Sequence, residues 1–209
     1  MNKFAIKENG FEYVDLGLPS GTMWAICNVG AKKPEDVGLL FQFGRVDGYK
    51  CGSRKNNFRT KDQNKQDTGN EFIPKTISGK IYDNNDILDL DDDAAHVNMG
   101  GAWKMPTKDQ LDELYDNTTH DVVDVNGVKG MMFTSNINKR KLFMPFMKGS
   151  VYNLNWDMWN QHFANIWSSQ VYASNGDNAY ALHCATFGYT VVDDYSRRFA
   201  YTVRGVFKK

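Results

Sequence analysis

The chain has 209 residues, of which 41% are hydrophobic and 24% are charged. A chain of this length fits one large domain or two small ones, and its apolar content is sufficient to bury a core. Its 25 basic and 25 acidic residues leave no net charge, which argues against a nucleic-acid partner because phosphate binding usually requires a basic face.

The N-terminal segment, MNKFAIKENGFEY, has no long apolar stretch and no small-residue cleavage pattern, so no signal peptide is expected. No segment approaches the ~18 consecutive apolar residues of a membrane span, and no membrane insertion is expected. Residues 1–10 are interpreted as an N-terminal lead and a possible docking segment. Because no linker divides the rest, residues 11–209 are predicted to form one domain.

Frequent turn signals between short apolar runs predict a strand-rich fold with little helix. Residues 11–16 and 23–29 are predicted strands, and the Pro-Ser-Gly sequence before the second is turn chemistry. Residues 45–82 are polar and lack aliphatic periodicity, which indicates a long insertion. The acidic run at residues 83–93 is interpreted as a solvated turn, although such a loop could also supply oxygen ligands to calcium.

The clearest helix is predicted to begin after Thr107. Thr107 and Gln110 have the spacing of a capping box, in which the two side chains bind otherwise unpaired amides of the first turn. Leu111, Leu114 and Tyr115 follow at the spacing of one apolar helix face.

Two hairpins are predicted after this helix. Residues 122–133 contain Asn-Gly at positions 126–127, which suits a type I′ turn because both residues tolerate positive φ. A second turn at residues 174–177 joins two apolar runs, and residues 198–207 form the predicted last strand.

Enzyme and metal signatures are not found in the sequence. The four histidines have no HExxH spacing, and there is no G-x-S-x-G, P-loop or Rossmann pattern. The three cysteines form no CxxC pair, so neither a zinc ribbon nor a disulfide framework is indicated. Cys27 and Cys184 lie in apolar runs and are interpreted as buried small hydrophobes. No cofactor is expected.

Seven ordered blocks carry a family resemblance. They are YVDLGLPSGTMWAICNVGA (13–31), GGAWKMPTKDQLDEL (100–114), MMFTSN (131–136), LFMP (142–145), IWSS (166–169), NAYALHC (178–184) and YTVRGV (201–206). Together they resemble the Fibrobacter succinogenes major paralogous domain family over residues 11–207. The resemblance implies an α+β, C-type-lectin-like fold with one or two short helices and paired N- and C-terminal strands.

The same fold occurs in proteins with well-defined activities, and the residues that carry those activities can be sought in this chain. Formylglycine-generating enzymes use a close pair of C-terminal cysteines, but only Cys184 lies in that half. Calcium-dependent lectins use EPN or QPD with a WND triplet, and none of these occurs here. Neither activity is therefore expected. Many family members are exported from Bacteroidetes cells, whereas the missing signal peptide favours a phage virion component or an intracellular protein.

Surface recognition is the remaining hypothesis, with two candidate surfaces. Residues 150–165 are rich in Tyr, Trp and Asn, a mixture typical of recognition surfaces, although Trp156, Trp159 and Phe163 could instead form a buried helix face. The loops predicted at residues 172–178 and 189–197 are the second surface, because variable residues cluster in C-terminal loops of related phage receptor proteins. The candidate ligand-binding residues are Tyr152, Asn153, Asn155, Asp157, Asn160, His162, Tyr172, Asn175, Asp177, Asp193 and Tyr195.

The sequence therefore predicts a non-enzymatic adhesion protein of a phage particle, such as a head fibre, decoration or tail component. Its expected partners are a host cell-surface glycan or protein, other virion proteins and further copies of itself. Many copies would make weak contacts effective through avidity. The alternatives are a purely structural virion protein and, last, an oxidase of the formylglycine-generating type.

Overall fold

The computed structural model describes residues 6–50, 76–77, 80–82, 85–148, 162–174, 176–197 and 199–209. The structure is 12% helical and 47% strand, which confirms the predicted strand-rich α+β class. None of the helices in the described ranges is long and apolar enough to cross a membrane.

The largest sheet has the strand order β14-β13-β12-β15-β4-β5, with β11 paired to β12 beside this path. β12 and β13 form the hairpin predicted around residues 174–177. The strands are β4 (Leu39–Gln42), β5 (Tyr49–Lys50), β11 (Met147–Lys148), β12 (His162–Val171), β13 (Asn178–Ala185), β14 (Thr190–Ser196) and β15 (Ala200–Thr202).

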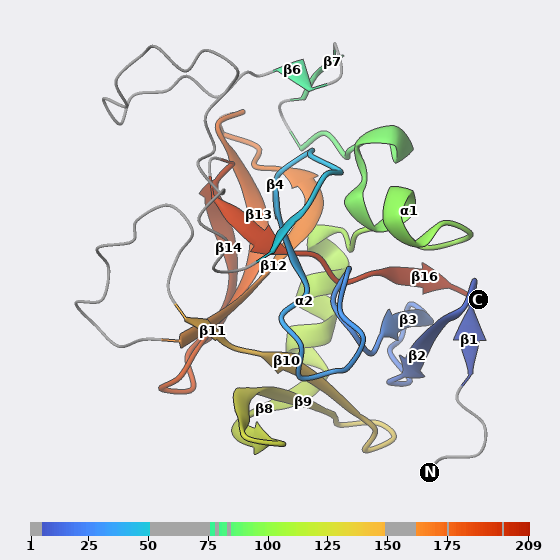
Figure 1. The fold of residues 1–209 in the computed structure, drawn as a ribbon, viewed down its shortest axis with the longest axis vertical. Helices are drawn as coiled ribbons and strands as arrows, with labels where there is room; N and C mark the ends of the chain where they lie inside the picture. Colours follow the sequence, from blue (N-terminus) through green and yellow to red (C-terminus); the bar gives the residue numbers. More distant parts are fainter. Residues whose placement is uncertain are drawn as a thin grey trace.

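A second sheet gathers both ends of the chain in the order β1-β2-β3-β16. Its strands are β1 (Lys7–Glu8), β2 (Phe11–Asp15), β3 (Thr22–Ala25) and β16 (Val206–Lys208). The C-terminus lies beside β1, on the side of the molecule away from β12, β13 and β14 (Figure 1). The expected direct pairing of the first predicted strand with the last is wrong, because β3 lies between β2 and β16 and pairs with both.

The predicted last strand, residues 198–207, is two strands in different sheets. β15 pairs with β4 and β12, whereas β16 pairs with β3. Between them the chain crosses from one sheet to the other at residues 203–205. Gly205 packs so closely on Met99 and Trp103 that a Cβ atom there would lie 2.7 Å from the Met99 sulfur. Residues 198–207 therefore do not form the one continuous strand that was predicted, and the break lies at the closely packed residues 203–205.

A third sheet contains β8 (Thr118–Val125), β9 (Val128–Ser135) and β10 (Lys141–Pro145). The predicted hairpin is confirmed, since Val125 pairs with Val128 around Asn126 and Gly127. These two turn residues have φ angles of 53° and 83°, the positive values that a type I′ turn requires.

The predicted helix is α2 (Lys108–Asp116), and its capping box is confirmed on both sides. The Thr107 hydroxyl accepts from the Gln110 amide, and the Gln110 side chain accepts from the Thr107 amide. Leu111 and Leu114 are fully buried, as expected. Tyr115 is 39% exposed, so its place on the apolar face is wrong. Its ring packs instead on His120 of β8, with centroids 4.8 Å apart.

The Pro-Ser-Gly turn before β3 is fastened to α2. The amide and hydroxyl of Ser20 donate to the two carboxylate oxygens of Glu113 at 2.7 and 2.6 Å. One turn earlier on the helix, Gln110 Nε2 donates to Thr22 Oγ1 at 3.0 Å. Residues 88 and 93 positions apart in the chain are thus joined by side chains from the two sequence blocks.

The acidic run is not solvated at its last two residues. Asp92 and Asp93 are both buried. Asp93 caps α1 (Ala94–Met99) by accepting from the His96 amide, and it also accepts from the amide of Met105. Asp92, at the end of the short 3-10 helix Leu90–Asp92, accepts from the Tyr82 hydroxyl at 2.7 Å. Both carboxylates satisfy buried donors, and Asp93 connects the start of α1 to Met105 of the WKMP block.

The polar insertion is described only in part. It includes β5 and the short hairpin β6 (Thr76–Ile77) and β7 (Lys80–Ile81), and it ends at the fully buried Tyr82. Residues 51–75 lie outside the described residues, as does Cys51.

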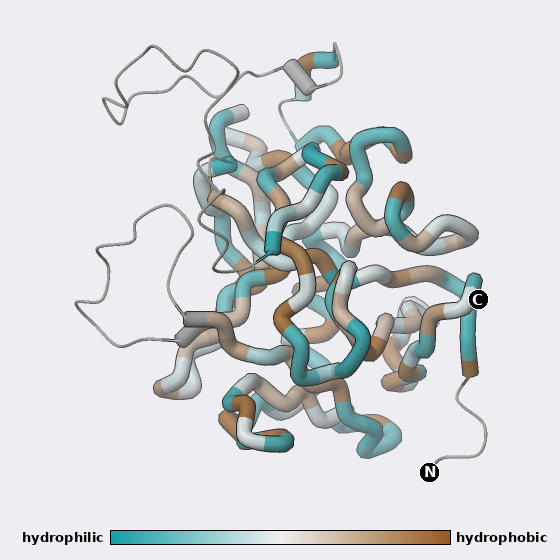
Figure 2. The backbone as a smooth tube through the Cα atoms, in the orientation of Figure 1, coloured by the Kyte–Doolittle hydropathy of each residue, from teal (hydrophilic) through white to brown (hydrophobic). Residues whose placement is uncertain are grey.

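Two buried clusters make up most of the core, one around Trp103 and Trp167 and the other around Trp24, Leu111 and Leu182. Hydrophobic stretches run through the middle of the molecule and the outer turns are mostly hydrophilic (Figure 2). α2 packs against β12, β13 and β14 and belongs to the second cluster. The opposite face of these strands is therefore not covered by α2.

Candidate functional site

Most residues of the first predicted surface cannot be placed. Tyr152, Asn153, Asn155, Asp157, Asn160 and the loop residue Asn175 lie outside the described residues. His162 is the first residue of β12, where its backbone pairs with Lys148, and its side chain is not described. The remaining candidates are Tyr172, Asp177, Asp193 and Tyr195.

Tyr172 and Asp177 flank the hairpin between β12 and β13. The Tyr172 ring packs edge-on against Tyr180 with centroids 5.4 Å apart. Lys108 of α2 lies 5.4 Å from the centroid of the same Tyr180 ring, so Tyr172 is on the side of the sheet that α2 covers. Asp177 is exposed, and its carbonyl oxygen accepts from the Arg197 amide.

Asp193 and Tyr195 lie on the other side. The segment 189–197 was predicted to be a loop, but residues 190–196 form β14, paired along its length with β13. Side chains alternate between the two faces of a strand, so residues 191, 193 and 195 share a face. The Tyr195 ring lies 5.8 Å from the ring of His183. His183 is three residues from Tyr180 along β13, so it lies on the face opposite to Tyr180 and to α2.

Five rings gather on this side of β12, β13 and β14, and we call them the aromatic face: Phe163, His183, Phe187, Tyr189 and Tyr195. His183 is the central member, since its ring centroid lies 5.3 Å from Phe163, 6.1 Å from Tyr189 and 5.8 Å from Tyr195. Phe187 lies 6.2 Å from Tyr189 in the turn after β13. Phe187 and Tyr189 are 67% and 51% exposed, so the cluster opens to solvent at this end.

The other end of the aromatic face is anchored in the core. Tyr195 contacts Tyr201, which packs in turn on Phe199 and on the fully buried Trp167. Trp167 Nε1 donates to the carbonyl oxygen of Phe41 at 2.9 Å. A continuous series of ring contacts therefore runs from the buried indole to the exposed Phe187, which holds the outer rings in a defined position.

His183 has a defined hydrogen-bonding state. Its Nδ1 lies 2.6 Å from Asn165 Oδ1, and because an amide oxygen only accepts, Nδ1 carries the proton. Asn165 is itself buried, and its carbonyl oxygen accepts from the Thr202 hydroxyl. Burial lowers the pKa of His183, which favours the neutral ring. In that tautomer Nε2 is a hydrogen-bond acceptor, and no described residue donates to it.

Tyr195 and the neighbouring Tyr201 stay protonated at neutral pH. Burial raises the pKa of Tyr195, and the negative charge of Asp193 raises it further. Burial likewise raises the pKa of Tyr201. At neutral pH their hydroxyl groups can therefore donate as well as accept hydrogen bonds.

The sequence interpretation did not select Phe163, His183, Phe187 or Tyr189 as contact residues. A partial signal was available, because every second residue from 179 to 185 is alanine except His183. That period of two marks strands. Which face lacks α2, however, depends on packing between distant segments.

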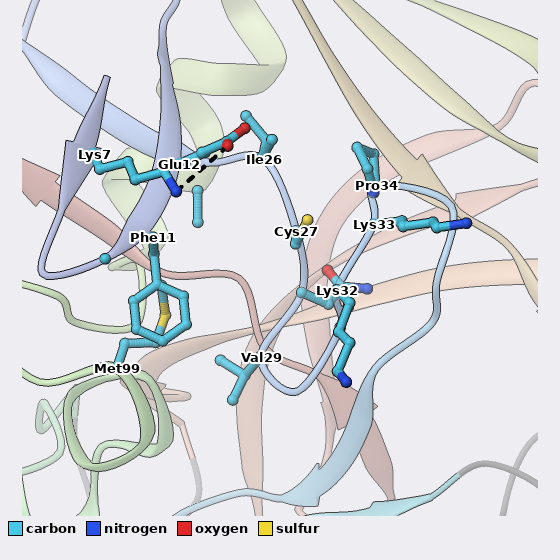
Figure 3. A pocket seen from close by; sticks show the side chains of 14 residues that line it. Lys7, Phe11, Glu12, Ile26, Cys27, Val29, Lys32, Lys33, Pro34 and Met99 are labelled. Carbon is cyan, nitrogen blue, oxygen red and sulfur yellow. Dashed lines mark ion pairs between the residues drawn. The ribbon is translucent and has the colours of Figure 1, made fainter. Parts of the chain in front are cut away.

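A separate pocket of about 290 Å³ lies beside β2 and the segment after β3. Phe11 and Met99 lie on one side of it, and Cys27 and Lys32 lie on the other (Figure 3). Cys27 is half-buried rather than buried as expected, and burial is the main cause that raises its pKa. A protonated thiol is a weak nucleophile, and the lining residues include no histidine to activate it.

The possible metal ligands are the His, Cys, Asp and Glu side chains of the described residues, among them the buried Cys184. Within the described ranges, no three His, Cys, Asp or Glu side chains gather closely enough to hold a metal ion. Cys184 is a buried small hydrophobe, as expected, and burial raises its pKa to about 12.

Comparisons with protein-family models, with curated proteins and with solved structures find no match to this chain. The family resemblance therefore rests on the sequence blocks, and the functional argument rests on the geometry of the aromatic face.

Proposed function

We propose that this protein is a non-enzymatic recognition domain that binds a host cell-surface ligand through the aromatic face. The observation that carries the proposal is the exposure of Phe187 and Tyr189, at 67% and 51%, on a series of ring contacts anchored in the core. Neighbouring exposed rings form an apolar patch, and such patches commonly mark interaction sites. Rings that are already immobile lose little entropy when they bind.

The C-type-lectin-like fold and the placement on a phage particle are part of the same proposal. A C-type-lectin-like fold is supported by the order of the sequence blocks and by the sheet that gathers both chain ends. Placement on a phage particle, with other virion proteins and further copies of the chain as partners, is supported by the sequence resemblance alone. Display of many copies would strengthen weak binding at each aromatic face.

A purely structural virion protein is the main alternative. Packing requires the inner rings, such as Trp167 and Tyr201, but it gives no reason to expose Phe187 and Tyr189. An oxidase of the formylglycine-generating type has less support, since Cys184 is buried and its thiol is protonated.

The test is binding of the purified protein to intact bacterial cells and to immobilised glycans. Replacing both Phe187 and Tyr189 by alanine removes the exposed rings while leaving the buried ones, so binding is expected to weaken about tenfold or more. The matched control is Tyr172→Ala, which removes a ring from the α2 side of the same sheet and is expected to leave binding unchanged.

Equal binding by the double variant and the parent protein would reject the aromatic face as the site. Loss of binding in Tyr172→Ala alone would assign recognition to the α2 side. No binding by the parent protein to any cell or glycan would support the structural alternative.

A further inference from the structure

The exposed end of the aromatic face is the ring pair of Phe187 and Tyr189, which we call the platform. The rings of Phe187 and Tyr189 are separated by 6.2 Å between centroids and are tilted by only 31°. Both residues are more than half exposed, so a ligand can reach these rings from solvent. A platform of this size matches a small ring-shaped ligand rather than a protein surface, which normally requires about 800 Å² on each partner.

Polar groups lie at the edge of this platform. His183, 6.1 Å from Tyr189 between ring centroids, offers Nε2 as an acceptor because Asn165 holds the proton on Nδ1. The Tyr189 and Tyr195 hydroxyl groups add donors and acceptors. A suitable ligand is therefore apolar on one face and carries hydroxyl groups around its edge.

The charges around His183 favour a ligand without negative charge. The groups that face it are Phe163 and Asn165 from β12, Tyr189 from the turn after β13, and Tyr195 from β14. Asp193, on the same face of β14, adds a carboxylate. Among the described residues of β12, β13 and β14 no lysine or arginine faces this side, and the buried Arg197 lies beyond the end of β14 over Phe43. The nearby carboxylate therefore disfavours an anionic sugar.

On the basis of the proposed function, we propose that the aromatic face binds a neutral carbohydrate. The C–H face of a pyranose ring stacks on Phe187 and Tyr189, and one sugar hydroxyl donates a hydrogen bond to Nε2 of neutral His183. His183 is thereby the residue that selects a hydroxyl group at this position.

This arrangement makes binding sensitive to acid. Protonation of His183 turns Nε2 from an acceptor into a donor and places a positive charge among the rings, which removes the hydrogen bond to the sugar. Because burial lowers the pKa of His183, the loss is expected below its ordinary value of about 6.5. Binding is therefore complete at neutral pH and declines as the pH falls through the pKa of the folded protein.

The experiment measures binding to an immobilised panel of neutral glycans and of glycans that carry sialic or uronic acid, from pH 5 to pH 8. Neutral glycans alone are expected to bind, with a loss in acid of about tenfold. His183→Gln is expected to weaken binding at pH 8 by about tenfold and to abolish the pH dependence. His120→Gln is the matched control, because His120 is also half-buried and hydrogen-bonded but lies on β8.

A second variant, Asn165→Asp, tests the role of the tautomer. A carboxylate keeps the proton on Nδ1 but stabilises the charged ring, so the acid loss should move to higher pH by about one unit or more. The nitrogen chemical shifts of His183 in the free protein give a readout that needs no ligand, and they should report a proton on Nδ1.

Three results would overturn the inference. One is equal binding of anionic glycans, another is wild-type pH dependence in His183→Gln, and the third is a proton on Nε2 of the free protein. If cells stripped of glycans still bind and Phe187 and Tyr189 are still required, the recognition function holds and the carbohydrate inference fails. If the parent protein binds neither cells nor glycans, both fail together.

Discussion

Arg204 is a buried cation that no carboxylate pairs with in the part of the chain that the structure describes. It is fully buried, and its Nε, Nη1 and Nη2 donate to Asn28 Oδ1, the Ala25 carbonyl and the Phe143 carbonyl at 2.8, 3.0 and 3.1 Å. These acceptors belong to the segment after β3, to β3 and to β10. One side chain therefore joins two sheets at the point where the chain crosses between β15 and β16.

Arg204→Met is expected to lower the free energy of unfolding by about 3 kcal/mol. Methionine fills similar space but leaves three buried acceptors without the donors of Arg204. The free-energy cost of these unpaired acceptors is expected to exceed the gain from no longer burying a charge. Urea unfolding measures the difference. The control is Arg45→Met, which removes an exposed arginine paired with Asp47 and is expected to change stability by less than about 1 kcal/mol. A loss of the same small size in both variants would show that Arg204 is dispensable.

At the scale of elements, the short-range signals in the sequence were reliable. The capping box, the Asn126-Gly127 turn and the hairpin around residues 174–177 all depend on residues a few positions apart, and each is confirmed. The loop predicted at residues 189–197 was wrong because Asp193 and Asp194 suggest solvent, although the segment pairs with β13. Charged residues on an edge strand are common, since they discourage pairing with other chains.

Thr107→Ala tests the helix start. Loss of the hydroxyl leaves the Gln110 amide without its partner, and the expected cost is about 1 kcal/mol in the free energy of unfolding. Thermal or urea unfolding measures it. Thr107→Ser keeps the hydroxyl and should retain nearly the parent stability, so an equally large loss in this variant would point to the missing methyl group rather than to the cap.

At the scale of the whole molecule, stability should depend on pH through the half-buried histidines. Burial lowers the pKa of both His120 and His183 in the folded protein. Below about pH 6.5 the unfolded chain therefore binds more protons than the folded one. Their contribution favours folding most above that pH and declines as the pH falls toward the folded pKa values.

The expected outcome is a lower melting temperature at pH 5.5 than at pH 7.5, with a smaller difference in the double variant His120→Gln and His183→Gln. Asp93 acts in the opposite direction, because burial raises its pKa and its protonation on acidification favours the folded state. An unchanged pH profile in the double variant would mean that carboxylates, rather than these histidines, control the response.

The sequence by itself determines the local structure of this protein. The strand-rich class, the start of α2 and the positive-φ turn between β8 and β9 follow from patterns that span a few residues. The aromatic face cannot be predicted from such short patterns. His183, Phe187, Tyr189 and Tyr195 are ordinary strand and turn residues until β12, β13 and β14 pair and α2 covers the opposite face. The pairing of β16 with β3 and the burial of Asp92, Asp93 and Arg204 likewise depend on contacts between segments that are far apart in the chain. Periodicity shows that a strand has two faces, but which face meets solvent depends on what packs against it.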